Sequence, residues 1–199
     1  MNRWGTVAIA YTLLAVASLW AADYWWNRSI ILLANPWLEL GGPMQAHAFS
    51  ALLGTCVGTI AVFGTKALVL RFAFASRLHA ELRPLALSLS TQMVVVLATA
   101  SAIGEEFFFR GVLLPWIGLG AQACLFGLLH QTGGSSRWVW VIWATIAGLL
   151  LGSMYQLTGS VVGPVFAHAL INGLNLHFLK RHDPSPERRP LGGLLGQRS

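Results

Sequence analysis

Residues 85–115 read LALSLSTQMVVVLATASAIGEEFFFRGVLLP, and this stretch decides what kind of fold the chain can adopt. As a helix it would be about 46 Å long at ~1.5 Å per residue, which exceeds the ~30 Å hydrocarbon core of a bilayer. Such a helix must tilt or protrude. From Leu85 to Leu179 the chain carries only four charged residues: Glu105, Glu106, Arg110 and Arg137. The region is therefore predicted to be a bundle of membrane-spanning helices.

The composition of the whole chain agrees with a membrane protein. Hydrophobic residues make up 55% of the 199 residues and charged residues 10%, with a mean hydropathy of +0.62. Soluble domains average about 45–50% apolar and about 25% charged residues, so a water-soluble globule, a disordered chain and a collagen-like repeat are excluded. The net charge of +6 is dispersed along the chain, which argues against a nucleic-acid partner. Cys56 and Cys124 lie in apolar runs, and no disulfide framework is expected.

Six apolar runs can be delimited as helices: 4–22, 46–65, 85–115, 119–131, 138–157 and 160–179. The predicted fold class is an all-α, polytopic membrane helix bundle of about six to eight transmembrane helices. The first run could also be a signal peptide, but its apolar stretch is longer than a signal core and favours an uncleaved span. The run 119–131 is too short to span a membrane unless it continues through Gly133 and Gly134.

Three parts of the chain are distinguished. Residues 1–84 hold the N-terminal membrane spans and interfacial segments, with 23–45 predicted as an interfacial loop or half-helix and 66–74 as an interfacial continuation. Residues 85–179 form a helical core. Residues 180–199, with several Pro, Gly and Arg, are predicted to be a basic, disordered cytoplasmic tail.

The distribution of Lys and Arg predicts the orientation, because these residues are enriched in cytoplasmic loops. With six spans, eleven of them fall on the face that holds both termini: Arg3, Lys66, Arg71, Arg77, Arg83, Arg137, Lys180, Arg181, Arg188, Arg189 and Arg198. Only Arg28 lies on the opposite face, beside Asp23 and Glu39. Both termini are therefore expected in the cytoplasm.

Two adjacent carboxylates stand within an apolar helix, in the sequence Gly104-Glu105-Glu106-Phe107-Phe108-Phe109-Arg110. Ionisable residues inside a span are costly and are functional candidates. Glu106 and Arg110 are four residues apart on one helix face, so an ion pair that fastens the helix accounts for both. Glu105 points about 100° away from Glu106 around the helix and has no such local partner. Glu105 is therefore the candidate for a general base or acid.

Two further helices carry polar candidates. His130 ends an apolar run, and His168 and Asn172 share one helix face, four residues apart. A lone histidine in such a helix is more often a hydrogen-bonding partner between helices. All four candidates, however, lie roughly 12–18 Å below the outer ends of their predicted helices at ~1.5 Å per residue. The carboxylate of Glu105, the two imidazoles and the carboxamide are therefore expected to meet in one layer.

This set of groups is compatible with two chemistries. Glu105 and His130 can polarise a water molecule, while His168 and Asn172 can donate hydrogen bonds to a developing oxyanion. Together they predict peptide hydrolysis without a serine or cysteine nucleophile. Alternatively, Glu105, His130 and His168 could ligate Zn²⁺ with water in the open position. The chain has no His-Glu-x-x-His pair, which weakens the metal alternative and leaves it open.

Three motifs in order carry a resemblance to a known family: Glu105-Glu106-x-x-x-Arg110, Phe126-x-x-x-His130 and His168-x-x-x-Asn172. They are similar to the motifs of the CPBP intramembrane proteases, which group the CAAX prenyl proteases with bacteriocin-processing (Abi) proteins. The resemblance covers residues 85–179 and makes them the catalytic core. It implies that Glu105 and His130 activate the water, and that His168 and Asn172 form the oxyanion site. Glu106 and Arg110 would support the helix that carries Glu105.

The resemblance also implies a glutamate-type intramembrane protease, a class formerly regarded as metalloproteases. No cofactor is expected, with Zn²⁺ as the alternative. The expected partners are the lipid bilayer and a membrane-anchored protein or peptide substrate, such as a C-terminal sorting tail or a CAAX-like tail, and no nucleic acid. The small size and short N-terminal part resemble bacterial members, so the bacterial inner membrane is the expected location.

Two other functions are compatible with the same residues. A non-catalytic membrane immunity or scaffold protein could share the fold, but it has no need of Glu105, His130 and His168. A proton-coupled transporter could relay protons through buried Glu and His side chains. No internal repeat is visible, and six spans are few for a carrier. The intramembrane protease is therefore the favoured prediction.

Overall fold

The structure, a computed structural model, describes residues 3–184, which fold into helices joined by short connections. In chain order the helices are α1 (Arg3–Trp26), α2 (Pro43–Arg71), α3 (Ala73–Leu87), α4 (Thr91–Glu106), the π-helix η1 (Phe107–Leu113), α5 (Leu114–Leu129), α6 (Arg137–Thr158) and α7 (Val162–Arg181). Extended pairing among the described residues is limited to an isolated bridge between Leu32 and Ser160. The predicted all-helical class is therefore confirmed. The disordered tail predicted for 180–199 is wrong at its start, because Lys180 and Arg181 belong to α7. Residues 182–184 follow this helix, and residues 185–199 lie outside the described residues.

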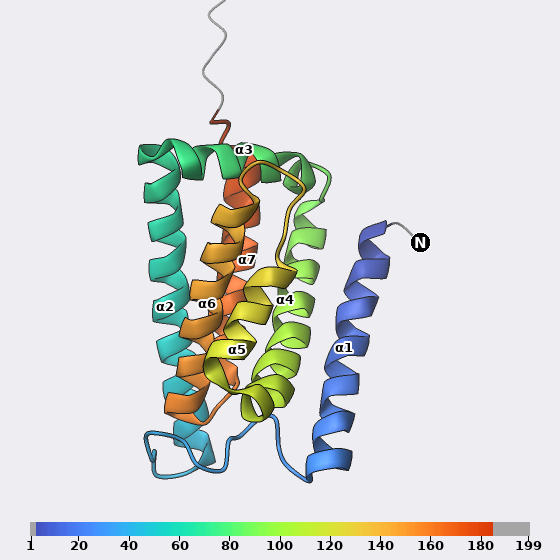
Figure 1. The fold of residues 1–199 in the computed structure, drawn as a ribbon, viewed down its shortest axis with the longest axis vertical. Coiled ribbons are helices and arrows are strands. Elements are labelled where there is room, and N and C mark those ends of the chain that lie inside the picture. Colours follow the sequence, from blue (N-terminus) through green and yellow to red (C-terminus); the bar gives the residue numbers. More distant parts are fainter. Residues whose placement is uncertain (1–2, 185–199) are drawn as a thin grey trace, which may run out of the picture.

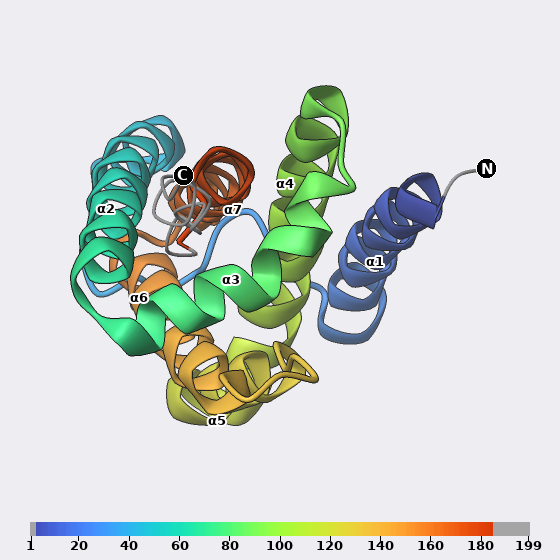
Figure 2. The ribbon, with the colours of Figure 1, turned by 90° about the horizontal axis from the view of Figure 1, so that it is seen from above.

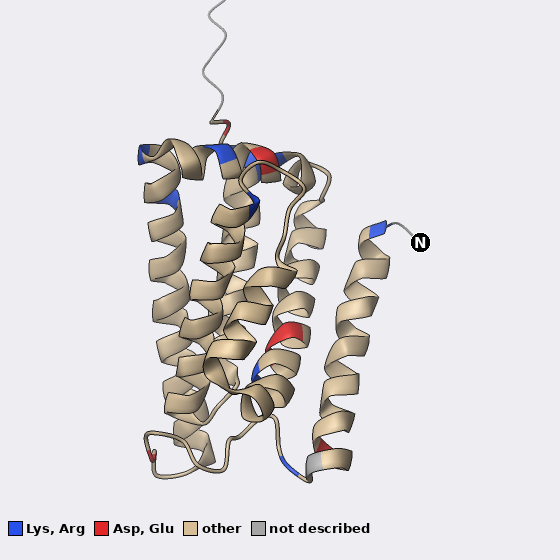
Figure 3. Ribbon diagram, viewed as in Figure 1, with Lys and Arg blue, Asp and Glu red and all other residues tan. Residues whose placement is uncertain are grey.

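Helices α2 and α7 run toward the end of the bundle that α3 crosses, whereas α1, α4 and α6 run away from it (Figures 1 and 2). The basic residues gather at that same end, on α3, at the start of α1 and α6 and at the end of α7 (Figure 3). The opposite end holds the connection 27–42 with Arg28. The two faces that the sequence separates by charge thus correspond to the two ends of the described bundle. Which end faces the cytoplasm stays a prediction.

The number of helices long and apolar enough to cross a membrane is smaller than the predicted six to eight. Four such stretches occur among residues 3–184: Arg3–Trp25, Pro43–Arg71, Thr91–Leu129 and Arg137–Thr158. Two features explain the difference. The third stretch turns back at Gly118, whose φ of 80° is left-handed, so α5 is a short helix that ends at Leu129 (Figure 1). Helix α7 is less apolar because, besides Lys180 and Arg181 in its last turn, it carries four polar side chains: His168, Asn172, Asn175 and His177.

The boundaries differ from the sequence prediction at the start of the core. The predicted helix 85–115 begins only at Thr91, because Leu85–Leu87 belong to α3. The predicted interfacial segment 66–74 is divided between the end of α2 and the start of α3. Ser90 caps α4 by accepting a hydrogen bond from the backbone N–H of Met93 at 3.1 Å. This serine cap explains why α4 begins at Thr91.

Helix α2 packs closely against α7 through small residues. A side chain at Gly54 would come within 2.1 Å of the Gly163 carbonyl oxygen, and one at Gly58 within 2.9 Å of the Ala167 Cα. Small residues four apart let two helix backbones approach in a membrane, where apolar side chains gain little by avoiding lipid. This contact fixes the height of α7, the helix that carries His168.

The connection 27–42, here called the strap, closes the end of the bundle away from α3. It contains no helix, although a half-helix was one prediction for this region. The N–H of Leu33 donates to the Gly159 carbonyl at 2.7 Å, and the Arg28 guanidinium donates to the Gly111 carbonyl at 2.9 Å. The buried Ile30 fills the space beside Gly111 and accepts a hydrogen bond from the Tyr155 hydroxyl at 3.0 Å. The strap therefore fastens η1 and the α6–α7 turn together.

Candidate active site

The two adjacent glutamates lie at the end of α4, where the helix continues as the π-helix η1. π-helical segments are rare and occur frequently at functional sites. The Nε atom of Arg110 lies 3.0 Å from Oε2 of Glu106, and both side chains are fully buried. The Arg110 guanidinium also lies 4.7 Å from the centre of the Phe126 ring. The structure thus contains the ion pair that the spacing of four residues predicts.

Glu106 has a second partner that the spacing does not reveal. Its Oε1 lies 2.7 Å from Nδ1 of His168 on α7. A carboxylate that is ion-paired with a guanidinium can only accept hydrogen bonds, so we assign the hydrogen to Nδ1 of His168. This contact orients the imidazole and leaves its Nε2 free to act on a neighbouring group.

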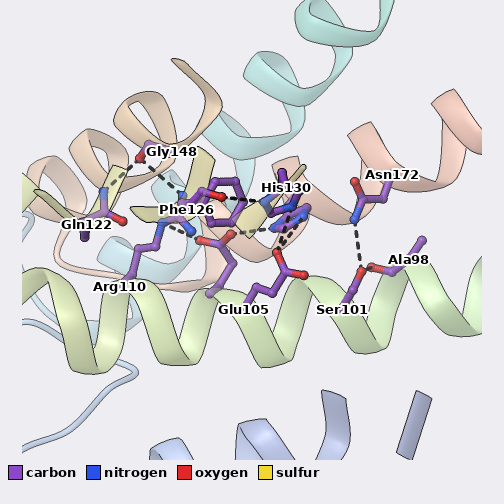
Figure 4. Close-up of polar contacts among 11 residues, drawn as sticks. Ala98, Ser101, Glu105, Arg110, Gln122, Phe126, His130, Gly148 and Asn172 are labelled. Carbon is purple, nitrogen blue, oxygen red and sulfur yellow. Dashed lines mark hydrogen bonds and ion pairs between the residues drawn. The ribbon is translucent and has the colours of Figure 1, made fainter. Parts of the chain in front are cut away.

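Glu105 faces two histidines. Its Oε2 lies 3.6 Å from Nε2 of His130 and 3.9 Å from Nε2 of His168 (Figure 4). Nδ1 of His130 lies 2.7 Å from the Phe126 carbonyl oxygen, which can only accept, so Nδ1 carries a hydrogen here too. In a neutral His130 the lone pair of Nε2 therefore points toward Glu105. The His130 side chain is 23% exposed and that of Glu105 10%, so the pair is reached more easily than the buried Glu106.

Asn172 lies beside this group but bonds elsewhere. Its Nδ2 donates to the Ser101 hydroxyl at 3.1 Å (Figure 4). Ser101 precedes Glu105 by one helical turn on α4, and Asn172 follows His168 by one turn on α7. The four residues predicted to share a layer are therefore brought together by α4, the end of α5, and α7, with Asn172 one turn toward the α3 end.

Several residues of this region were missed by the sequence reasoning. The side chain of Tyr11 on α1 interacts with that of Glu105. Helix α1 reaches this position because residue 104 is glycine: a Cβ there would lie 2.6 Å from the Tyr11 carbonyl oxygen. Tyr11 lies 94 positions before Glu105 in an apolar run, so no local pattern could have indicated it.

A further missed contact lies behind the ion pair. The Gly148 carbonyl on α6 accepts hydrogen bonds from Arg110 at 3.3 Å and from the fully buried Gln122 at 3.2 Å (Figure 4). It therefore fixes the guanidinium on the side away from Glu106. In the sequence, a Gln within the apolar run of α5 signals a polar contact, but it does not indicate the partner.

The suitability of these residues for a metal is a separate question. No group of three or more His, Cys, Asp or Glu side chains within the described part of the chain is arranged to hold a metal ion. Nδ1 of His168 is directed to Glu106 and Nδ1 of His130 to Phe126, so only the Nε2 atoms face Glu105. The choice between metal-free and zinc chemistry stays a prediction.

The fold and the site together define an integral membrane protein of α-helices that buries a cluster of glutamate, histidine and arginine side chains. Residues 87–174 match the family model described as type II CAAX prenyl endopeptidase Rce1-like. The resemblance to the CPBP family is confirmed for this segment, which contains all six predicted site residues. Tyr11 and helices α1 and α2 lie outside it.

A curated protein is similar to part of the chain. The chain is 37% identical over 81 residues to the uncharacterized protein YpbD of Bacillus subtilis (strain 168). This match covers 41% of the present chain and 42% of the relative, so it spans less than half of either protein. No solved structure matches the chain.

Proposed function

We propose that this protein is an intramembrane endopeptidase that hydrolyses a peptide bond of a membrane-associated protein substrate. One observation carries the proposal: within an apolar bundle, Oε2 of Glu105 faces the Nε2 atoms of His130 and His168 at 3.6 and 3.9 Å. A carboxylate and two imidazoles directed at one point are costly in a membrane unless they serve chemistry. The description of the matching family model, an endopeptidase, supports the same activity.

Glu105 and His130 would activate the attacking water. The 3.6 Å between Oε2 and Nε2 is too long for a direct hydrogen bond and suits a water molecule that donates one hydrogen to each atom. The water oxygen attacks the carbonyl carbon of the scissile bond, and its proton passes to Glu105. Glu105 then gives this proton to the leaving nitrogen as the C–N bond breaks, so that the carboxylate is restored.

His168 and Asn172 would stabilise the oxyanion that forms during the attack. With Nδ1 of His168 bonded to the Glu106 carboxylate, a second proton on Nε2 gives an imidazolium whose charge Glu106 partly compensates. Nδ2 of Asn172 would turn from Ser101 toward the same oxygen. Arg110 pairs with Glu106 on the side away from the substrate. This pair would therefore position His168 and would not contact the substrate itself.

The position of the site within an apolar bundle supports a proposal for the substrate and the setting. A protein or peptide anchored in the bilayer can present its backbone to buried residues, and a C-terminal sorting tail or a CAAX-like tail is the substrate class we propose. We place the protein in a bacterial inner membrane with both termini cytoplasmic, on the charge asymmetry between the two ends of the bundle. We propose glutamate-dependent catalysis by the protein's own residues, without a cofactor.

The test compares membranes from bacterial cells that express the wild-type chain or Glu105→Gln. Mass spectrometry of protein termini is expected to find new membrane-protein ends with the wild type and none with Glu105→Gln. Glu39→Gln, which changes an exposed carboxylate on the strap, is the matched control and should resemble the wild type. An equal set of new termini with Glu105→Gln would refute the proposed mechanism.

A further inference from the structure

A cavity of about 160 Å³ lies between α1, α4 and α7, on the side of Glu105 that faces α3. Its walls are mainly apolar and include Trp4 and Val7 of α1, Leu97 of α4 and Leu176 of α7. None of these residues belongs to the cluster of Glu, His and Arg described above. The cavity is therefore a separate feature that adjoins the candidate active site.

The inner end of the cavity is polar and touches the site directly. It is formed by Tyr11, Ser101 and Asn172. Tyr11 interacts with Glu105, and Asn172 donates to Ser101 one helical turn from Glu105. A group that filled the apolar part would therefore hold its attachment point next to the residues proposed to bind the scissile carbonyl.

The size and lining of the cavity indicate what it would accept. An apolar protein cavity of about 150 Å³ is large enough to hold a benzene molecule. The described walls contribute no charged group to the cavity, so a charged side chain would lose its hydration without a partner. A large apolar group such as the side chain of leucine or phenylalanine matches both the volume and the polarity.

We infer that this cavity is a specificity subsite, which receives a large apolar side chain of the protein substrate beside the bond that is cleaved. The inference rests on the proposed endopeptidase function and extends it to the choice of cleavage position. One wall belongs to α1, which the family match at 87–174 does not include. The preference would therefore depend on the N-terminal helix as well as on the matched core. Helix α1 lies at the edge of the bundle and contacts α4 and η1 (Figure 2), so in a membrane its other face would lie against lipid.

The test uses two substitutions of opposite effect in the purified full-length protein. Val7→Trp narrows the cavity, and Leu176→Ala enlarges it. Ile9→Trp is the matched control, because Ile9 lies on the same helix but is 47% exposed on the outer side of the bundle. Each protein is incubated in detergent with a proteome-derived peptide mixture, and mass spectrometry identifies the residues around each cleaved bond.

The wild type is expected to favour Leu or Phe at one fixed position relative to the cleaved bond. Val7→Trp should lower the ratio of Phe to Ala at that position by about tenfold, since pocket contacts of this size discriminate in that range. Leu176→Ala should shift the preference toward Trp, and Ile9→Trp should leave it unchanged. Size-exclusion chromatography and thermal melting show that each variant is folded, and Leu176→Ala carries the test if Val7→Trp does not fold.

Two results would overturn the inference, and they can be told apart. If both cavity variants cleave with the wild-type preference, the subsite is refuted while the proposed function stands. If wild type and Glu105→Gln give the same peptides, the proposed function is refuted, and the subsite falls with it.

Discussion

Nδ1 of His168 lies 2.7 Å from one oxygen of Glu106, while the other oxygen of Glu106 lies 3.0 Å from Nε of Arg110. A single buried carboxylate thus joins an imidazole of α7 to a guanidinium of η1. Its neighbour Glu105 is directed to the Nε2 atoms of His130 and His168 instead. The two adjacent glutamates therefore have different contacts. Glu106 connects two helices, whereas Glu105 faces the point where we propose that the substrate reacts.

Glu106→Gln should destabilise the protein much more than Glu105→Gln does. The substitution leaves Arg110 buried and without its counter-charge, a change that typically costs about 3–5 kcal/mol of unfolding free energy. Glu105→Gln keeps the shape of a side chain that holds no ion pair with Arg110 and should remain near wild-type stability. Unfolding of both variants in mixed micelles measures the difference. Equal losses of unfolding free energy in the two variants would show that Glu106 contributes no more to stability than Glu105 does.

Removal of metal should leave the activity unchanged if Glu105 and His130 work without a metal ion. The purified wild-type protein is treated with EDTA and phenanthroline, and its metal content is measured by mass spectrometry before and after. Peptide cleavage is then compared under both conditions. One equivalent of zinc that is lost together with the activity would contradict metal-free catalysis and favour ligation by Glu105, His130 and His168.

Cysteine labelling should place the strap outside the cell and α3 in the cytoplasm, as the positive charges predict. Asn35 of the strap and Ala80 of α3 are both exposed, at opposite ends of the bundle, so Asn35→Cys and Ala80→Cys form a matched pair. Both are made in a chain whose two exposed native cysteines, Cys56 and Cys124, are replaced by serine.

In intact cells a membrane-impermeant thiol reagent should label Asn35→Cys, while Ala80→Cys should react only after lysis. The reverse pattern would place α3 outside and invert the orientation. The catalytic assignment would survive that result, because it depends on distances within the bundle. The cavity, which lies on the α3 side of Glu105, would then lie toward the outer leaflet.

Glu81 on α3 should make the stability of the α3–α6 contact dependent on pH. It accepts hydrogen bonds from the Ser135 hydroxyl at 2.8 Å and from the Ser136 N–H at 3.2 Å, just before α6 begins. These bonds, the Ser135 hydroxyl first, lower the pKa of the Glu81 carboxyl from its ordinary value of 4.5. The stabilisation is therefore fully present above about pH 4.5 and is lost as the pH falls through the lowered pKa.

The melting temperature of Glu81→Gln should thus lie below that of the wild type at pH 7, and the two should converge in acid. Glu39→Gln on the strap is the control, since it removes one exposed carboxylate at the other end of the bundle. If the difference in melting temperature between Glu81→Gln and the wild type stays constant from pH 7 to pH 3, the ionised carboxylate contributes nothing to this contact.

The sequence predicts those parts of the site that depend only on position along a helix. The spacing of Glu106 and Arg110 was sufficient for their ion pair, and the rise per residue was sufficient to place Glu105, His130 and His168 at one depth. The contact of His168 with Glu106 needs the rotation of α7 relative to α4, which the sequence of neither helix contains. Tyr11 could not be predicted for the same reason, because its partner belongs to another helix.

The fold shows the same division. Apolar runs in the sequence predict the helices α1, α2, α4 and α6. The counts of Lys and Arg predict which ends of these helices lie together on the basic side of the bundle. The apolar runs overestimate the number of spans for two reasons. The helix after the turn at Gly118 ends at Leu129 and is too short to cross a membrane alone, and α7 contains the polar residues of the site. The strap was the least predictable element. Its hydrogen bonds to Gly159 and Gly111 connect positions 80 or more residues apart.

The close packing of Gly54 against Gly163 and of Gly104 against Tyr11 bears on how the chain could be divided. Both contacts join the segment matched by the family to helices that precede it. A fragment limited to 87–174 would expose Gly163 and Gly104, which α2 and α1 cover in the whole bundle. The segment matched by the family is therefore smaller than the helical unit in which it packs. Moving this core into another protein would leave both contacts uncovered unless α1 and α2 are moved with it.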